Sequence, residues 1–197
     1  MRIITALVIQ VIFIIFYSCS SSKKEHAKSS EESLTYELIN YVIESKLQNF
    51  QNEYSRCKYL LDKEPYTVLS AKDSIRLIHL DTLFSKKDLD TIFKQNLAIK
   101  DFSINPKFLN VKIEIISSDT LIHYMDNSDD FWDQYYNKFG RNGFAIVSRP
   151  LFSLDRQTAI IKYSCQYHGL NGEFNTLIYK RKNNRWEVIH VLNASIS

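Results

Sequence analysis

The spacing of apolar side chains divides the chain into a helical N-terminal part and a strand-rich C-terminal part. From Tyr36 to Leu61, apolar residues recur every three or four positions, which is the periodicity of one helix face. Pro65 cannot continue a helix, so we expect one long amphipathic helix of about 30 residues before it. Packing across the protein's own sheet is favoured over a coiled coil, because the stripe lacks sustained leucines at a and d positions.

Two shorter helices are expected in the middle of the chain. Residues 85–97 begin with a capping pattern and continue with helically spaced apolar residues. Residues 128–140 begin with acidic side chains at the positive end of a helix and close with a glycine. Between the long helix and the first of these, short apolar pieces in residues 66–80 predict edge strands or loop. The alternation in residues 110–116 predicts a half-buried strand.

The C-terminal part of the chain has the clearest pattern. Apolar and polar residues alternate over four runs separated by turn residues: 143–147, 158–168, 174–182 and 185–192. Asn183-Asn184 tolerates the positive φ that a tight hairpin requires. We therefore predict an α+β fold. A C-terminal antiparallel β-meander of about four to six strands packs through its apolar face against the long N-terminal helix and the two shorter helices.

The first nineteen residues form a separate segment. A basic start at Arg2, an apolar run from Ile3 to Tyr17 and a small residue before a cleavage point are typical of a secretory signal peptide. The apolar run is 15 residues long, whereas a membrane-spanning helix needs roughly 20, so a cleaved leader is favoured over a transmembrane anchor. Because Cys19 directly follows Ser18, the leader resembles a bacterial lipoprotein signal, in the looser form found in Bacteroidetes lipoproteins.

That resemblance implies a domain organisation and a location. It implies cleavage after Ser18, which removes residues 1–18, and acylation of Cys19 with palmitate-type chains that anchor the protein persistently in a membrane. Residues 19–30 are small or charged and are expected to form a flexible tether. Residues 31–197 then form a single α+β domain in the cell envelope. The outer membrane is the expected location because no acidic residue directly follows the cysteine. The sequence does not indicate whether the protein lies on the periplasmic or the surface face of that membrane.

Composition and motifs argue against several functions. The chain has 25 Lys+Arg and 22 Asp+Glu, a balance that gives no reason to expect a nucleic-acid partner. The basic segment from Lys180 to Arg185, beside Trp186, is interpreted as a solvated hairpin tip. Its charges would keep the strand edge from pairing with another chain. Nucleophile motifs, phosphate loops and metal-ligand spacings are absent from the sequence. We therefore expect no catalytic residue, cofactor or metal site, and a non-catalytic domain is favoured over an enzyme.

Two cysteines remain besides the lipidated one. Cys57 and Cys165 would lie in an oxidising compartment, where a disulfide is allowed. Both fall on apolar stripes, however, and two small buried free thiols are the favoured interpretation.

A second resemblance covers about half of the chain after the leader. The segments Ser148-Arg149-Pro150-Leu151-Phe152 and Lys182-Asn183-Asn184-Arg185-Trp186, with a glycine-rich turn between them, resemble the C-terminal half of uncharacterised Bacteroidetes lipoproteins. The motifs are strand and turn signals, and the family implies no activity for this chain.

The sequence therefore predicts a lipid-anchored binding or accessory domain whose partner is an envelope protein, a peptide or a glycan. The candidate ligand contacts are Tyr163, Tyr167, His168 and Trp186. One alternative is an envelope hydrolase whose site is assembled from dispersed residues. The other is a carrier that holds an apolar ligand in a cavity between sheet and helix, lined by Tyr163, Tyr167 and Trp186.

Overall fold

The structure is a computed structural model of the 197-residue chain. It describes residues 31–46, 57–64, 67–99, 102–127, 130–168 and 171–196. The expected leader, its cleavage point at Ser18, the acylated Cys19 and the tether lie outside the described residues. The chain divides into two compact units, Met1–Glu37 and Leu38–Ser197, and the sheet lies in the second.

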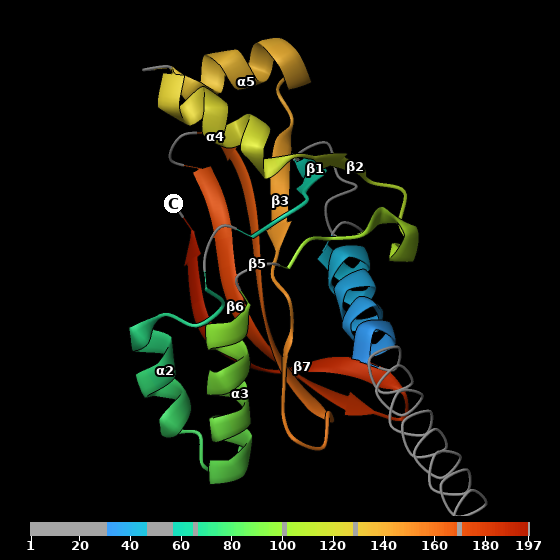
Figure 1. Cartoon of the computed structure of the whole chain (residues 1–197), viewed down its shortest axis with the longest axis vertical. Coiled ribbons are helices and arrows are strands. Elements are labelled where there is room, and N and C mark those ends of the chain that lie inside the picture. The colour runs from blue at the N-terminus through green and yellow to red at the C-terminus, as the bar shows by residue number, and fades with distance from the viewer. Residues whose placement is uncertain are drawn as a thin grey trace, which may run out of the picture. The chain divides into compact units, whose positions relative to one another are not determined.

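One seven-stranded, mostly antiparallel sheet forms the centre of the second unit (Figure 1). The strands follow the order β2-β1-β3-β5-β6-β7, and β4 pairs with β5 outside this path. β1 is parallel to both β2 and β3, whereas the other pairs are antiparallel. The strands are β1 (Cys57–Leu61), β2 (Glu114–Ile116), β3 (Gly143–Val147), β4 (Leu151–Phe152), β5 (Thr158–His168), β6 (Asn171–Lys182) and β7 (Arg185–Ile196). The predicted α+β class with C-terminal strands is confirmed.

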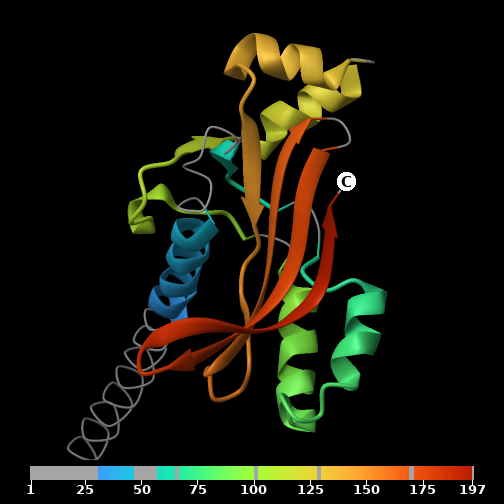
Figure 2. The ribbon, with the colours of Figure 1, turned by 180° about the vertical axis from the view of Figure 1, so that it is seen from behind.

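Helices of the second unit, which includes the first helix only from Leu38 onward, pack around its sheet (Figures 1 and 2). The described ones are residues 31–46, α2 (Ala71–Ile78), α3 (Lys86–Ala98), the short 3₁₀ turn η1 (Pro106–Phe108), α4 (Ser118–Asn127) and α5 (Phe131–Phe139). Ile178 of β6 lies in the apolar cluster that includes residues of α2 and α3. Its neighbour Tyr179 instead contacts Tyr41 of the first helix, with ring centroids 6.0 Å apart. Successive strand residues point to opposite faces, so helices cover both faces of the sheet.

This arrangement corrects the expectation that the helices gather on one face. β3 is buried at all five of its positions, as expected for a strand that is covered on both sides. A second apolar cluster joins α4 and α5 to the parallel end of the sheet, with Tyr135 and Leu121 packed near Tyr59 and Phe144.

The predicted single helix through Leu61 is wrong, because residues 57–61 form β1. A short apolar run suits either a helix or a strand, and periodicity alone does not separate the two. Pairing with β2 and β3 decides the outcome here, since β1 is buried at four of its five positions. Residues 47–56 lie outside the described residues.

The middle of the chain holds more helix than expected. Part of the segment assigned to edge strands or loop forms α2, whose capping box joins Ser70 and Asp73. Only Glu114–Ile116 of the strand expected over residues 110–116 pairs in the sheet. The helices expected over residues 85–97 and 128–140 are α3 and α5. α4 was not predicted.

Among the described residues, no helix combines the length and apolar character needed to cross a bilayer.

Candidate functional site

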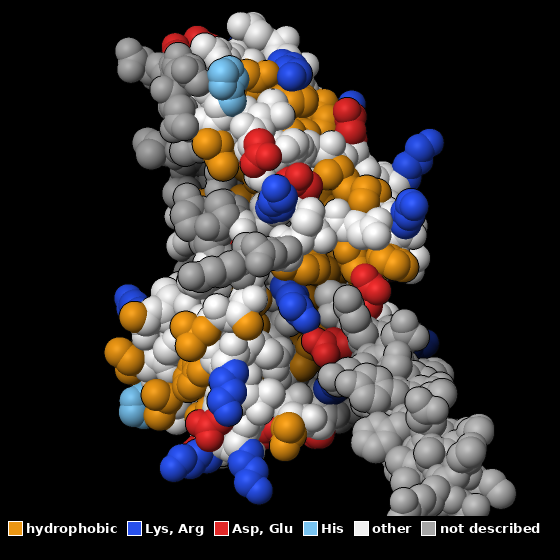
Figure 3. All heavy atoms as spheres, in the orientation of Figure 1, with side chains coloured by type: hydrophobic (Ala, Val, Ile, Leu, Met, Phe, Trp, Pro, Cys, Tyr) orange, Lys and Arg blue, Asp and Glu red, His pale blue; other side chains and the backbone are white. Residues whose placement is uncertain are grey.

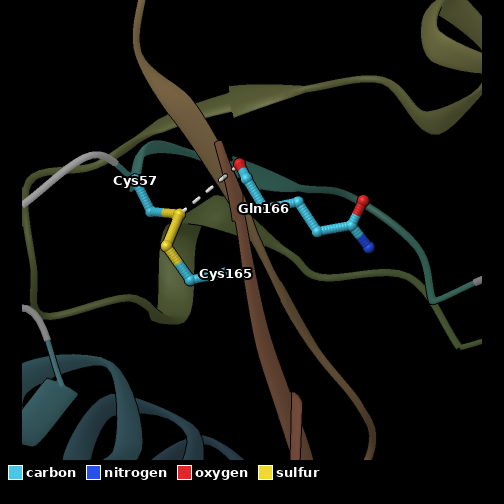
Figure 4. The surroundings of a disulfide bond; sticks show 3 residues. All are labelled: Cys57, Cys165 and Gln166. Atoms are coloured by element: carbon cyan, nitrogen blue, oxygen red, sulfur yellow. Dashed lines mark hydrogen bonds between the residues drawn. A yellow bond between two sulfur atoms is a disulfide. The ribbon is translucent and has the colours of Figure 1, made fainter. Parts of the chain in front are cut away.

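A disulfide bond joins Cys57, at the start of β1, to Cys165 in β5 (Figure 4). The two Cα atoms are 5.9 Å apart although 108 residues separate them in sequence, and this Cα distance is ordinary for a disulfide. The strand register shifts between Cys57 and Tyr59. The Cys57 Sγ atom also lies 3.8 Å from the carbonyl oxygen of Gln166.

The disulfide corrects the interpretation of two buried free thiols. Both cysteines are buried, as expected. β1 and β5 both pair with β3, and the register shift at the start of β1 accompanies the approach of Cys57 to Cys165. The local sequence around either cysteine does not predict that the two residues lie close together.

The most distinctive polar pair of the described residues consists of Glu64 and Lys162. The Lys162 Nζ atom lies 3.0 Å from Glu64 Oε1, and the two side chains are 24% and 4% exposed. The second carboxylate oxygen, Oε2, is buried and has no hydrogen-bond partner among the described residues. Most ion pairs between lysine and glutamate lie at the surface, so a carboxylate this deeply buried requires a physical explanation.

The segment that carries Glu64 is held by contacts with distant parts of the chain. This segment follows β1, and Asp62, two residues before Glu64, accepts hydrogen bonds from two distant residues. The Asp62 carbonyl oxygen accepts from the Ile104 amide at 2.7 Å. The Asp62 side chain accepts from the Ser118 amide at 2.8 Å and so satisfies a donor at the start of α4. Glu64 is therefore placed by the end of β1.

Lys162 is held at an interruption of the sheet. β3 and β4 both pair with β5, and residues 148–150 separate them. At this gap the Ser148 amide donates to the Lys162 carbonyl at 3.0 Å. The Ser148 hydroxyl accepts from the Lys162 amide at 2.9 Å and donates to the Arg149 carbonyl. The Ser148 hydroxyl oxygen thus accepts the hydrogen bond that a backbone carbonyl would accept between two paired strands.

Burial determines the electrostatics of this pair. Desolvation raises the pKa of Glu64 from 4.5 to about 6, against the lowering effect of the charge and hydrogen bond of Lys162. The loss of hydration therefore outweighs the attraction of the ammonium group. A pKa of about 6 is closer to neutral pH than that of an ordinary glutamate, and a general acid or base is most effective when its pKa lies near the working pH.

The pair lies where the sheet changes from parallel to antiparallel pairing. β1 and β3 are parallel, so their carboxyl ends meet at one edge, and Glu64 and Ser148 follow those ends. β3 is antiparallel to β5, which supplies Lys162. Ligands of open α/β sheets commonly bind outside the carboxyl ends of parallel strands. Chemically, the arrangement can hold a carboxylate and an ammonium group together and can move one proton.

A second polar cluster lies on the opposite face of β5, beside Lys46 of the first helix. Lys46 Nζ lies 3.3 Å from Glu173 Oε1 and 5.8 Å from the ring centre of Tyr163. Tyr163 is fully buried, and its hydroxyl has no hydrogen-bond partner among the described residues. Burial, and then the charge of Glu173, raise the pKa of Tyr163 above its usual range. Tyr163 therefore stays protonated, as a neutral hydroxyl next to an ion pair.

The structure places the other candidate ligand contacts apart from this cluster. Trp186 is buried in β7 and lies 6.2 Å from the Phe152 ring. Tyr163 pairs with Asn175, which pairs with a β7 residue eight positions beyond Trp186, about 26 Å along the strand. Tyr167 is partly exposed near the end of β5, and its carbonyl accepts from the Tyr136 hydroxyl at 2.6 Å. The His168 side chain lies outside what the structure describes.

Sequence reasoning missed Glu64, Lys162 and Ser148. Two local signals were available: a lysine in the middle of an otherwise apolar strand, and a polar Ser-Arg-Pro interruption between two apolar runs. Neither signal identifies the partner, because Glu64 lies almost one hundred residues before Lys162 in the chain.

Comparison with known proteins found no family model, no curated protein and no solved structure that matches this chain. Within the described part of the chain, no group of three or more His, Cys, Asp or Glu side chains is arranged to hold a metal ion.

Proposed function

We propose that this protein is a lipid-anchored component of the bacterial cell envelope, whose domain serves as a binding or accessory module. The single observation that carries the proposal is the Cys57–Cys165 disulfide. Structural disulfides persist in oxidising compartments such as the periplasm and the cell surface, and are rare in the reducing cytosol. The bond therefore supports the export that the leader sequence predicts.

The anchor follows from the lipoprotein-like leader. Two or three acyl chains on Cys19 would hold the protein firmly, whereas a single chain gives only marginal binding. The proposed location is the outer membrane. The proposed partners are the membrane, through the anchor, and an envelope protein, peptide or glycan bound by the domain. We propose no nucleic-acid partner, because export places the chain away from the cytoplasm.

The anchor is tested by mass analysis of the mature N-terminus after expression in a bacterial host with lipoprotein-processing enzymes. We expect residues 1–18 to be absent and Cys19 to carry the added mass of acyl chains. The variant Cys19→Ser should leave the membrane fraction after the leader has been cut. A retained leader or an unmodified Cys19 would contradict the proposal.

The same cells test the compartment. Alkylation of free thiols before lysis should leave Cys57 and Cys165 unmodified, because they are bonded to each other. A cytoplasmic version of the chain without residues 1–18 provides the matched control, and its two thiols should be alkylated. Free thiols in the exported protein would remove the observation on which the proposal depends.

An acid–base enzyme is the second candidate, and Glu64 is the observation that favours it. A buried carboxyl with a pKa of about 6, within hydrogen-bond reach of a lysine, is a typical functional-site candidate. Turnover of ester, glycoside or peptide substrates that disappears in Glu64→Gln, but persists in Glu187→Gln, would favour the enzyme over the binding module.

A further inference from the structure

Three segments that are distant in sequence each carry basic side chains and lie near one another in the fold. They are residues 85–88 at the start of α3, residues 153–157 between β4 and β5, and residues 180–187 around the β6–β7 hairpin turn. We call these three segments together the basic end. Figure 3 shows several lysine and arginine side chains at the lower edge of the face that it draws.

Hydrogen bonds join the three segments to one another. The Arg181 amide donates to the Gln157 carbonyl at 2.7 Å, which ties the hairpin to the β4–β5 turn. The Leu154 amide donates to Asp88 Oδ1 at 2.9 Å, which ties that turn to α3. The three segments of the basic end are therefore held next to one another.

The charge of the basic end is strongly one-sided. Seven basic residues stand against three acidic ones: Lys86, Lys87, Arg156, Lys180, Arg181, Lys182 and Arg185 against Asp88, Asp155 and Glu187. The acidic groups have partners within these segments, because Asp88 caps α3, Asp155 accepts within its own turn and Glu187 pairs with Lys182. Arg156 and Arg181 also have interactions of their own. The whole chain carries a formal charge of only +3, so positive charge is concentrated here.

The part of the first helix that belongs to the second unit begins at Leu38. Tyr41 contacts Tyr179 and Lys46 contacts Glu173, so the helix runs antiparallel to β6. Moving back along the helix, toward Leu38, therefore means moving along β6 toward Lys182 and the hairpin turn. Leu38, the first residue of the second unit, therefore lies toward the β6–β7 hairpin turn.

We infer that the basic end binds the surface of an anionic phospholipid membrane and orients the domain on it. The inference rests on the proposed function, in which an acylated Cys19 keeps the domain near the bilayer. Basic side chains within a Debye length of anionic headgroups are attracted to them. Leu154, which is 63% exposed in the β4–β5 turn, supplies an apolar side chain that can enter the interface.

The test is amine labelling of the mature, acylated full-length protein in vesicles of phosphatidylethanolamine and phosphatidylglycerol. A membrane-impermeant acetylating reagent modifies exposed lysines, and mass spectrometry compares each lysine with the same lysine in detergent. We expect labelling of Lys180, Lys182, Lys86 and Lys87 to fall about fivefold. Lys138 is the internal control, because α5 contacts β5 near Tyr167, at the opposite end of that strand from Thr158. Its labelling should not change.

A triple variant separates charge from fold. Lys180→Gln/Lys182→Gln/Arg185→Gln should restore labelling of Lys86 and Lys87 in anionic vesicles, and 1 M salt should do the same in the wild type, because it shortens the Debye length to about 3 Å. The matched double variant Lys180→Arg/Lys182→Arg keeps the charge and should retain the protection.

The outcomes distinguish this inference from the proposed function. Acylated protein whose basic-end lysines react equally in vesicles and detergent would overturn the inference and leave the anchor intact. Equal protection in neutral phosphatidylcholine vesicles would also overturn it, since recognition would then not depend on charge. An unacylated Cys19 would overturn both.

Discussion

Replacing Glu64 by glutamine should stabilise the protein at neutral pH, even though it removes an ion pair. The substitution keeps the shape of the side chain and removes the buried charge. Lys162, which is 24% exposed, keeps its access to solvent. Because the loss of hydration already outweighs the attraction of Lys162 in the folded protein, the ionised form of Glu64 is the unfavourable one.

The magnitude follows from proton linkage. The pKa of Glu64 is about 6 in the folded state, against 4.5 for the group in water. Between these two values the folded protein binds more protons than the unfolded chain, so the free energy of unfolding falls as the pH rises. The total fall is about 2 kcal/mol, at about 1.4 kcal/mol for each pKa unit. Below pH 4.5 the group is protonated in both states and its contribution to stability is fully present.

The assay is equilibrium urea unfolding between pH 4 and pH 8, followed by tryptophan fluorescence. The variant and the wild type should have similar stability at pH 4, and the variant should be more stable by about 2 kcal/mol at pH 7.5. Glu187→Gln is the matched control: its pair with Lys182 has the same 3.0 Å separation, but the two side chains are 53% and 54% exposed. The control should show little change with pH. A difference that is constant with pH, or a variant that becomes less stable as the pH rises, would refute the reasoning.

Three further outcomes are expected from the same unfolding assay. Cys57→Ala/Cys165→Ala should lower the free energy of unfolding by about 2–4 kcal/mol, and a reductant should destabilise the wild type but not the variant; an equal response of both proteins would contradict the disulfide. Ser148→Ala should lower the free energy of unfolding by about 1–3 kcal/mol, because the Lys162 amide loses its hydrogen-bond acceptor. Hydrogen exchange at the Lys162 amide should become faster, and an unchanged exchange rate would exclude this role of the Ser148 hydroxyl. Tyr163→Phe should raise stability by up to about 1 kcal/mol, since the hydroxyl is buried without a partner among the described residues; a loss of stability would reveal a partner.

The elements that could be read from the sequence are those with strong local signals. α3 begins at the capping box of Ser85 and Asp88, which local chemistry specifies. The β6–β7 hairpin turns at Asn183 and Asn184, both of which have the positive φ that asparagine tolerates. Such features depend on side chains a few residues apart, so their geometry is encoded where they occur.

The wrong secondary-structure predictions concern short segments whose pattern is compatible with more than one type of structure. Residues 57–61 fit the helical spacing that precedes them, yet they form β1, because β2 and β3 offer hydrogen-bonding partners on both sides. α2 was missed because its capping serine and aspartate stand in a short polar stretch that also suits a loop. Strand pairing decided the structure of residues 57–61, and a short capping motif marks the start of α2; hydrophobic periodicity alone predicted neither element.

The sequence by itself determined the class of fold and the antiparallel C-terminal strands, and its first nineteen residues are the basis on which we predict export and acylation. Only the tertiary structure decided that Cys57 meets Cys165, that Glu64 is buried against Lys162, and that three basic segments lie next to one another. The physical reason is distance along the chain. Periodicity and capping act over a few residues, whereas these contacts join segments dozens of residues apart, and strand order and register alone determine which of those segments meet.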